Sequence, residues 1–311
     1  MNKLYKAVIL LFKDRKRLLF LLLIRIAILF PDKLYLSLLF RLKMGYWFDW
    51  NNPKSFSEKL QWLKLYNRNP LYSQLVDKYE VKNYVSKQIG QNYIISTLGV
   101  WDKPEYIDWD ILPTKFVLKT THGGGGVGVI VCKDKSLLDK QSAILKLKKA
   151  MKQDIFTALR EWPYKNVKPR IIAEEFVEET ENNQNEDLQD YKFYCFGGEP
   201  KLMMISTGRS TGNLCFDYYD MDWNKVPLVW DKPNSNITHF CPSCFDEMKN
   251  LCRILSKDIP HVRCDFYVVN NKPLFGELTF FDSSGFSKFE DEKWNFKIGE
   301  WIDIPSHRIL K

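Results

Sequence analysis

Four consecutive glycines at positions 123–126 separate two short stretches rich in β-forming residues, 116–120 and 127–132. This order excludes the Walker loop and the dinucleotide fingerprint, because both of those glycine-rich loops open a helix. A strand is expected on each side here, so the glycines form the tip of a hairpin. Glycine lets the backbone approach a ligand closely and turn its N–H groups towards an anion. We therefore predict a lid over phosphate groups; the alternative is a plain flexible hairpin.

A lysine accompanies this glycine loop. Lys119 lies on the incoming strand, four residues before the first glycine. From that position its ammonium group can reach the α- or β-phosphate of a nucleotide. The pattern therefore predicts a phosphate site with its own positive charge.

Two acids, Asp265 and Glu277, stand twelve residues apart in a second predicted hairpin. If its loop has an odd length, such as 270–272, Val269 pairs with Pro273 and the two carboxylates lie opposite each other on one face. An even loop would put them on opposite faces. Facing carboxylates need a positive charge between them, and Mg²⁺ bound to nucleotide phosphates meets that need. The alternative is that both acids form ordinary surface ion pairs.

The remaining chain mixes helical and strand patterns, which indicates an α+β fold. A helix is expected from Glu58, capped by Ser55 or Ser57. Further helices are expected at 71–89, 137–156 and 245–256, and further strands at 93–97, 171–177, 191–196, 201–206, 263–269 and 274–281.

The net charge of +8 is concentrated at the N-terminus. Residues 1–50 carry ten Lys and Arg against three Asp, whereas the remainder is nearly neutral, which argues against a nucleic-acid partner. The apolar run 18–30 is broken by Arg25 and is shorter than the roughly 20 residues of a spanning helix. We predict that 1–45 forms two short amphipathic helices on an anionic membrane surface. Packing against the body and true spanning are the alternatives.

The seven cysteines are odd in number and lack the spacing of a disulfide framework. This favours a reducing setting. Together with the basic N-terminus it predicts a cytoplasmic protein that associates peripherally with the inner face of the cell membrane.

The order of the motifs resembles the ATP-grasp superfamily. That order is a lysine strand, a glycine-rich hairpin, Glu-Glu-Phe-Val, Asp-Tyr-Lys, Arg-x-Asp and Gly-Glu-x-Thr. Phrases such as Asn-Pro-Lys-Ser-Phe-Ser-Glu-Lys-Leu-Gln-Trp at 52–62 are similar to its TupA-like branch, named for a teichuronopeptide-biosynthesis protein. The resemblance covers about residues 50–305. It implies two α+β subdomains that clasp ATP, preceded by the N-terminal helices. The chain then divides into membrane-associating helices (1–45), an N-terminal helical or α+β subdomain (46–115) and a nucleotide-binding and catalytic region (116–305).

The resemblance also implies roles by position, with ATP and Mg²⁺ as cofactors. Glu174 would contact the adenine amino group, with the backbone of Phe176 and Val177 as a hinge, and Asp190 would bind the ribose. The residues assigned to ATP are Lys78, Lys119, Gly123, Gly124, Gly125, Gly126, Glu174, Phe176, Val177 and Asp190. Those assigned to catalysis or the acceptor are Lys192, Arg209, Asn213 and Arg263, and those assigned to metal are Asp265, Glu277 and Thr279. Thr279 stands where the superfamily usually has Asn.

Members of this superfamily typically phosphorylate a carboxylate and let an amine displace the phosphate. The resemblance implies a ligase of surface polysaccharide biosynthesis (capsule, O-antigen or teichuronic type) that joins a carboxylate-bearing sugar or glycan to an amine such as an amino acid. One alternative is a glycosyltransferase of the same pathway that uses a nucleotide sugar, with metal held by Asp220 and Asp222. A second alternative is an inactive nucleotide-binding scaffold.

Overall fold

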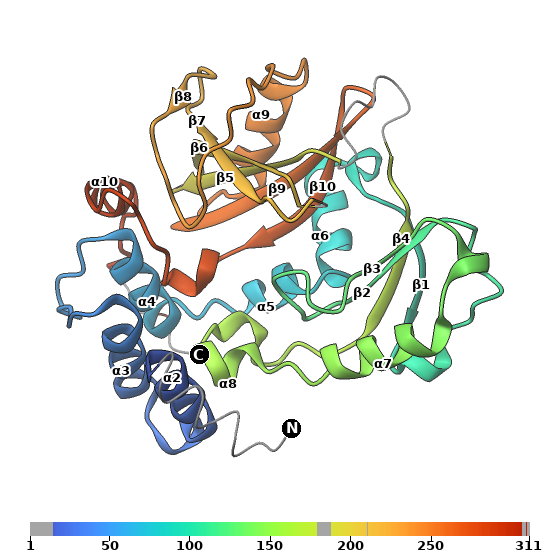
Figure 1. The fold of residues 1–311 in the computed structure, drawn as a ribbon. Coiled ribbons are helices and arrows are strands. Elements are labelled where there is room, and N and C mark those ends of the chain that lie inside the picture. The colour runs from blue at the N-terminus through green and yellow to red at the C-terminus, as the bar shows by residue number, and fades with distance from the viewer. Residues whose placement is uncertain (1–14, 179–187, 210, 307–308, 310–311) are drawn as a thin grey trace.

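The computed structural model describes residues 15–178, 188–209, 211–306 and 309 of the 311-residue chain. Two antiparallel β-sheets with helices packed around them form the described part, so the α+β expectation is confirmed (Figure 1). The predicted metal residues, and Lys119, Glu174 and Asp190 of the predicted ATP residues, lie on strands of these two sheets.

The smaller sheet has four strands in the order β1-β4-β2-β3. They are β1 (Thr97–Trp101), β2 (Phe116–Thr120), β3 (Ile130–Cys132) and β4 (Ile171–Glu175). β2 and β3 are antiparallel, which confirms the glycine hairpin. Phe116 and Leu118 of β2 are buried in a core that also includes Leu147 of α7 (Lys140–Ala150). The alternation of strand side chains leaves Lys119 on the opposite face.

The larger sheet has six strands in the order β10-β9-β5-β6-β7-β8. They are β5 (Asp190–Phe196), β6 (Glu199–Thr207), β7 (Cys215–Tyr219), β8 (Lys225–Val226), β9 (His261–Val269) and β10 (Lys272–Thr279). Phe193, Cys264 and Phe266 join one core with Phe245 and Met248 of α9 (Phe245–Leu255). The opposite face carries the polar residues of β5 and β9.

The helices between and beside the sheets are α4 (Phe56–Tyr66), α5 (Leu71–Val76), α6 (Glu80–Ile89), α8 (Ile155–Leu159) and α10 (Lys293–Glu300). Short 3-10 turns are η1 (Ala27–Leu29), η2 (Gln91–Tyr93), η3 (Pro104–Tyr106), η4 (Lys135–Leu137), η5 (Trp162–Tyr164) and η6 (Asp282–Gly285). Ser55 caps α4, which confirms one of the two predicted caps, although the helix begins at Phe56 rather than Glu58; Glu58 completes a capping box.

Two helices expected to be continuous are each divided. The stretch 71–89 breaks at Asp77, whose carboxylate accepts the backbone N–H groups of Tyr79 and Glu80 and so starts a new helix. The stretch 137–156 breaks before Asp154, which caps α8 in the same way. The strand expected at 93–97 is also displaced, because η2 occupies its start and β1 begins at Thr97.

The N-terminal part contains α2 (Arg15–Arg25), η1 and α3 (Asp32–Met44). Ala27, Tyr35 and Leu39 form a small core of their own, against which Phe20 and Leu159 pack. No helix in the described ranges combines the length and the apolar character that crossing a membrane requires. The first 14 residues of the predicted membrane-associating part lie outside the described residues.

The predicted division at residue 115 is crossed by one sheet. β1 lies in the proposed 46–115 part and pairs with β4 of the proposed 116–305 part. The division into three parts therefore stays a prediction, and residue 115 does not mark a boundary between the two sheets.

Candidate ATP and metal site

The predicted metal and catalytic residues share one face of the larger sheet. Strand register places Lys192 of β5 beside Asp265 of β9, and Asp265 beside Glu277 of β10. The next row on that face holds Arg263 and Thr279. Lys192 and Asp265 are therefore strand neighbours of opposite charge. Arg263 and Thr279 are strand neighbours joined by a hydrogen bond.

The prediction of an odd loop between β9 and β10 is wrong, although the expected pairing of the acids is confirmed. Val269 pairs with Lys272, so the turn has two residues, Asn270 and Asn271. Both have positive φ angles, which asparagine tolerates better than most residues and which a tight hairpin turn requires. The missing residue is supplied by a bulge between Phe275 and Glu277, which returns Glu277 to the face of Asp265.

Three basic side chains surround the paired acids. Lys192 Nζ lies 2.6 Å from Asp265 Oδ2, and Arg263 donates to both oxygens of Asp265 at 2.7 Å. Glu277 lies 3.3 Å from Lys78 Nζ and 3.4 Å from Arg263 Nη2. Burial raises the pKa of Glu277, but Lys78, Arg263, Lys192 and Lys119 outweigh it and hold the pKa at about 2. The Glu277 carboxylate is thus kept ionised.

The donor set fits a hard divalent cation. Two carboxylates lie on one face, with the Thr279 hydroxyl 3.3 Å from Glu277 Oε1. Oxygen ligands of this kind suit Mg²⁺, which is usually bound through one or two carboxylates and substrate phosphates. Thr279 Oγ1 also accepts a hydrogen bond from Arg263 Nη2 at 3.2 Å, so it is already engaged with the site.

A second cluster lies on the smaller sheet around Glu174. This buried carboxylate is bound by Lys119 at 2.5 Å and by Lys82 at 2.6 Å. Burial raises the pKa of Glu174, but the two ammonium groups lower it below its ordinary value. The sequence reasoning missed Lys82, which stands four residues after Lys78 and could have been found from that spacing. The predicted contact of Glu174 with adenine stays a proposal.

Lys78 connects the glycine loop with the acidic pair. Its Nζ donates to the carbonyl oxygen of Gly123 at 2.6 Å and lies 3.3 Å from Glu277 Oε2. Its backbone N–H donates to Thr121 on the same loop. Lys78 thus contacts both the glycine loop of the smaller sheet and Glu277, a predicted metal ligand on the larger sheet. A triphosphate bound between the two sheets would have to contact the same two elements.

The four glycines differ in whether the backbone and packing at each position require glycine. An added Cβ at Gly123 would lie 2.5 Å from Thr120 Oγ1, so this position needs the small residue for packing. Gly125 and Gly126 have positive φ angles, which disfavour any L side chain. Gly124 has neither restriction, since an added Cβ would meet only Ile155 at 3.7 Å. The loop geometry therefore leaves Gly124 without a structural reason to be glycine.

Asp190 is buried beside Lys192 and has an unused oxygen. Lys192 contacts its Oδ2, whereas Oδ1 has no hydrogen-bond partner in the described part of the chain. Burial raises the pKa of Asp190 above its ordinary value. An orphaned acceptor at this position fits a ligand hydroxyl such as that of ribose. Arg209 reaches to 3.9 Å from Asp190 and is otherwise largely exposed, and Asn213 is exposed on the same connection.

Arg263 has a further partner that the sequence reasoning missed. Asp282, in the η6 turn after β10, binds Arg263 Nη1 and also accepts from the Tyr194 hydroxyl at 3.1 Å. The carboxylates of Asp265 and Asp282 hold the Arg263 guanidinium in place. They keep its pKa well above the ordinary value, although burial alone would lower it. The polar run Asp-Ser-Ser-Gly directly after the metal strand was the available signal.

The predicted hinge residues Phe176 and Val177 follow β4 directly and are half-buried. Lys115 Nζ lies 5.8 Å from the centre of the Phe176 ring. The acidic segment 179–187 that follows lies outside the described residues. Their adenine role remains a prediction.

The acids of the glycosyltransferase alternative have a structural use. Asp220 accepts hydrogen bonds from the backbone of Asp222 and Asn224 and from the Asn224 side chain. These bonds close the turn between β7 and β8. Because Asp220 is engaged in this turn, the Asp-x-Asp spacing needs no metal to explain it.

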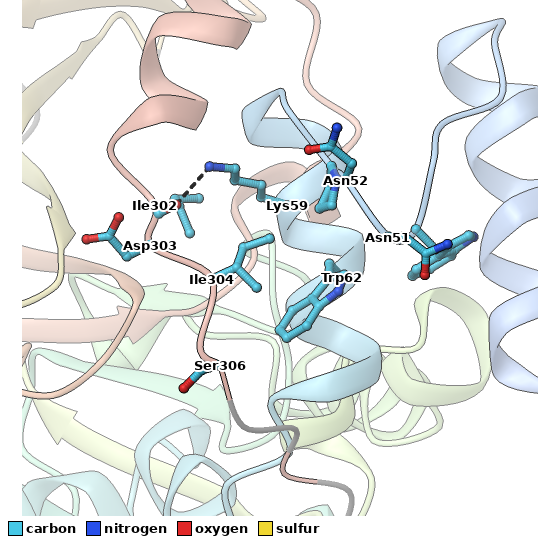
Figure 2. A pocket seen from close by; sticks show the side chains of 10 residues that line it. Asn51, Asn52, Lys59, Trp62, Ile302, Asp303, Ile304 and Ser306 are labelled. Atoms are coloured by element: carbon cyan, nitrogen blue, oxygen red, sulfur yellow. Dashed lines mark hydrogen bonds between the residues drawn. The ribbon is translucent and has the colours of Figure 1, made fainter.

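A cavity of about 440 Å³ lies elsewhere, between α4 and the C-terminal segment (Figure 2). Trp62 and Lys59 of α4 line it together with Asn52 and Ile304, and Lys59 Nζ donates to the carbonyl oxygen of Ile302 at 2.9 Å. None of the residues predicted to bind ATP or metal lines this cavity.

The fold and the paired acid, lysine and glycine clusters define an ATP-grasp protein. The TupA-like ATPgrasp family model matches residues 58–303, and the chain belongs to this family. Comparison with curated proteins gave no match.

Solved structures show more distant similarity. D-Alanine-D-alanine ligase from Helicobacter pylori is 15% identical, with 74% of this chain and 59% of that chain covered and a TM-score of 0.42. The corresponding ligase from Bacillus anthracis is 13% identical, with 66% and 57% covered and a TM-score of 0.39. The ATP-grasp ligase PsnB, complexed with a precursor variant, Mg and ADP, is 12% identical, with 76% and 56% covered and a TM-score of 0.36. This chain spans less than two thirds of each structure, and such distant similarity adds nothing to the family assignment.

Proposed function

We propose that the protein is an ATP-dependent carboxylate–amine ligase of surface polysaccharide biosynthesis. The observation that carries the proposal is the contact of Lys78 with both the glycine loop and Glu277, which joins the predicted phosphate lid to the predicted metal pair. Membership of the TupA-like ATP-grasp family supports the reaction class. The substrates proposed are a carboxylate-bearing sugar or glycan and an amine such as an amino acid.

In the proposed first step, a carboxylate oxygen of the sugar attacks the γ-phosphorus of ATP. The bond from this phosphorus to the β–γ bridging oxygen breaks, and ADP leaves with that electron pair. Lys78, Lys119, Lys192 and Arg263 supply positive charge, which lowers the repulsion between the carboxylate and the triphosphate. When bound, Mg²⁺ at Asp265 and Glu277 would neutralise phosphate oxygens.

In the second step, the amine nitrogen attacks the acyl carbon of the acylphosphate. The C–O bond to phosphate breaks, inorganic phosphate leaves and the nitrogen loses a proton to water, which gives an amide. The acylphosphate is needed because a free carboxylate is a poor electrophile. Arg263, which Asp265 and Asp282 hold in ion pairs, would bind the negative charge of the departing phosphate.

Hydroxylamine offers a test that needs no knowledge of the natural amine. Purified protein is incubated with Mg²⁺, ATP, hydroxylamine and a uronic acid such as glucuronate or galacturonate. The proposal expects hydroxamate and ADP in equal amounts, with no hydroxamate when ATP is omitted. UDP release from a UDP-sugar in the absence of ATP would instead identify a glycosyltransferase.

A further inference from the structure

An apolar surface is exposed on the N-terminal helices. We call it the N-terminal apolar face, and it consists of Leu19, Leu21, Leu22, Ile26, Ile28 and Leu29. The most exposed members are Ile28 at 83% and Leu29 at 75%, both in η1. In Figure 1, α2 lies at the edge of the molecule, beside α3 and below α4. A monomeric soluble protein rarely leaves so many adjacent large apolar side chains in water.

The two sides of α2 differ in what they contact. Phe20 and Leu23 turn towards the small core formed by Ala27, Tyr35 and Leu39. Leu19, Leu22 and Ile26, at helical spacing, lie on the side that remains exposed. The small core is therefore formed without Leu19, Leu22 and Ile26.

The N-terminal helices that carry this face are also basic. The exposed bases of the described N-terminal helices are Arg17, Arg25, Lys33, Arg41 and Lys43. Between residues 15 and 48 the one acid is Asp32, and it is bound by Arg68 at 2.5 Å and by Arg160 at 2.8 Å. These helices therefore attract anions.

Arg160 fixes the apolar face to the body of the protein. Its Nη2 donates to the carbonyl oxygen of Ala27 at 2.6 Å, and its guanidinium lies 4.4 Å from the centre of the Tyr35 ring. The Tyr35 hydroxyl in turn donates to Ala158 at 2.8 Å. These contacts attach η1 to the body of the protein, while the side chains of Ile28 and Leu29 remain exposed.

We infer that the N-terminal apolar face docks on an anionic lipid surface, with Ile28 and Leu29 inserted among the headgroups. Exposed apolar side chains on helices rich in Lys and Arg suit such an interface, where apolar burial and attraction to anionic lipids act together. A second copy of the chain fits less well, because a two-fold contact would bring the same positive surfaces together. The inference deepens the proposed function, since a lipid-linked glycan acceptor would be met at this surface.

Vesicle sedimentation with the full chain tests the inference. We expect binding to vesicles of phosphatidylcholine with phosphatidylglycerol, weaker binding to phosphatidylcholine alone, and partial release by salt. The double variant Ile28→Ser with Leu29→Ser should bind roughly 10-fold or more weakly, because two apolar side chains then no longer leave water on docking. Leu137→Ser is the matched control, since Leu137 is equally exposed (83%) in η4 on the other part of the molecule, and it should bind as the parent does.

Three outcomes would overturn the inference. They are absence of vesicle binding, equal loss of binding in the Leu137→Ser control, and a dimer in light scattering that the Ile28→Ser/Leu29→Ser variant dissociates. The last result would identify a second copy as the occupant. ATP binding is measured in the same preparations: if it is absent while vesicle binding follows the pattern above, the ligase proposal fails and the docking inference stands.

Discussion

Glu277 lies opposite Asp265 across the β9–β10 hairpin only because β10 carries a bulge. Without the extra residue, a two-residue turn would direct Glu277 to the other face of the sheet. Gly276 suits the bulge, since an added Cβ would lie 3.1 Å from the Asp265 carbonyl oxygen. A local irregularity of one strand thus assembles the acidic pair on which the proposed metal site depends.

Replacing Glu277 tests the metal assignment. Glu277→Gln removes one negative charge from the pair and should leave ATP binding without Mg²⁺ nearly unchanged. The stimulation by Mg²⁺ should disappear, and turnover should fall at least about 100-fold, which corresponds to about 2.7 kcal/mol of transition-state stabilisation. Calorimetric titration of ATP with and without Mg²⁺ measures the first effect. Glu290→Gln, at an exposed acid outside the site, should change neither.

Replacing Lys119 tests the phosphate assignment. Lys119→Ala should weaken ATP binding about 10- to 100-fold, because a hydrogen bond to a charged group contributes about 1.5–3 kcal/mol. Glu174 keeps Lys82 as a partner, so the fold should survive, and the melting temperature checks this. Lys149→Ala, on the exposed side of α7, provides the control. Equal affinities of the Lys119→Ala variant and the parent would rule out a phosphate contact.

The glycine loop offers a test that separates strain from ligand contact. Gly124→Ala meets no steric conflict in the free protein, so the melting temperature should stay the same. ATP binding should nevertheless weaken several-fold if the loop backbone closes on phosphates. Gly126→Ala, where φ is +73°, should lower stability by about 1–2 kcal/mol regardless of ligand. Unchanged ATP affinity in Gly124→Ala would show that the loop does not approach the phosphates at that residue.

His261 makes stability depend on pH. Burial among aromatic rings lowers the pKa of His261 to about 3, and its Nδ1 bonds the Cys195 carbonyl oxygen. As the pH falls below about 6.5, the ordinary pKa of histidine, His261 binds a proton in the unfolded chain. In the folded chain His261 does not bind this proton until the pH approaches 3. Stability is therefore lost as the pH falls through this window, by on the order of a few kcal/mol.

The variant His261→Phe isolates this contribution. It should be less stable at pH 7, because the bond to Cys195 is lost, and it should lose less further stability between pH 7 and pH 4 than the parent does. Urea unfolding at the two pH values measures the difference. An identical loss in both proteins would assign the acid sensitivity to other groups.

Residues whose roles depend on strand alternation could be predicted from the sequence. Lys192 and Asp265 fall on one face because side chains alternate along each strand, and β-type runs identify the strands. Glu277 joins that face through the bulge in β10. The predicted length of the β9–β10 loop was wrong because two features compensate each other. The two-residue turn with left-handed Asn270 and Asn271 alone would move Glu277 to the other face of the sheet, and the bulge returns it.

Contacts between distant segments could not be predicted in this way. Asp282 binds Arg263 from a turn that follows a different strand, and Lys82 reaches Glu174 from a helix more than 90 residues earlier in the chain. No local period records such pairs, because they arise from how α6 and η6 pack against the sheets. The same holds for Arg160, whose contact with Ala27 joins the N-terminal helices to the body.

Nucleotide binding tests the central claim most directly. Calorimetric titration of the 311-residue chain with ATP and with UDP-glucose, each with and without Mg²⁺, distinguishes the two reaction classes. The ligase account predicts saturable binding of ATP that Mg²⁺ strengthens, that Lys119→Ala weakens, and that UDP-glucose does not displace. Binding of UDP-glucose that depends on Asp220 or Asp222 and not on Lys119, with no binding of ATP, would contradict it.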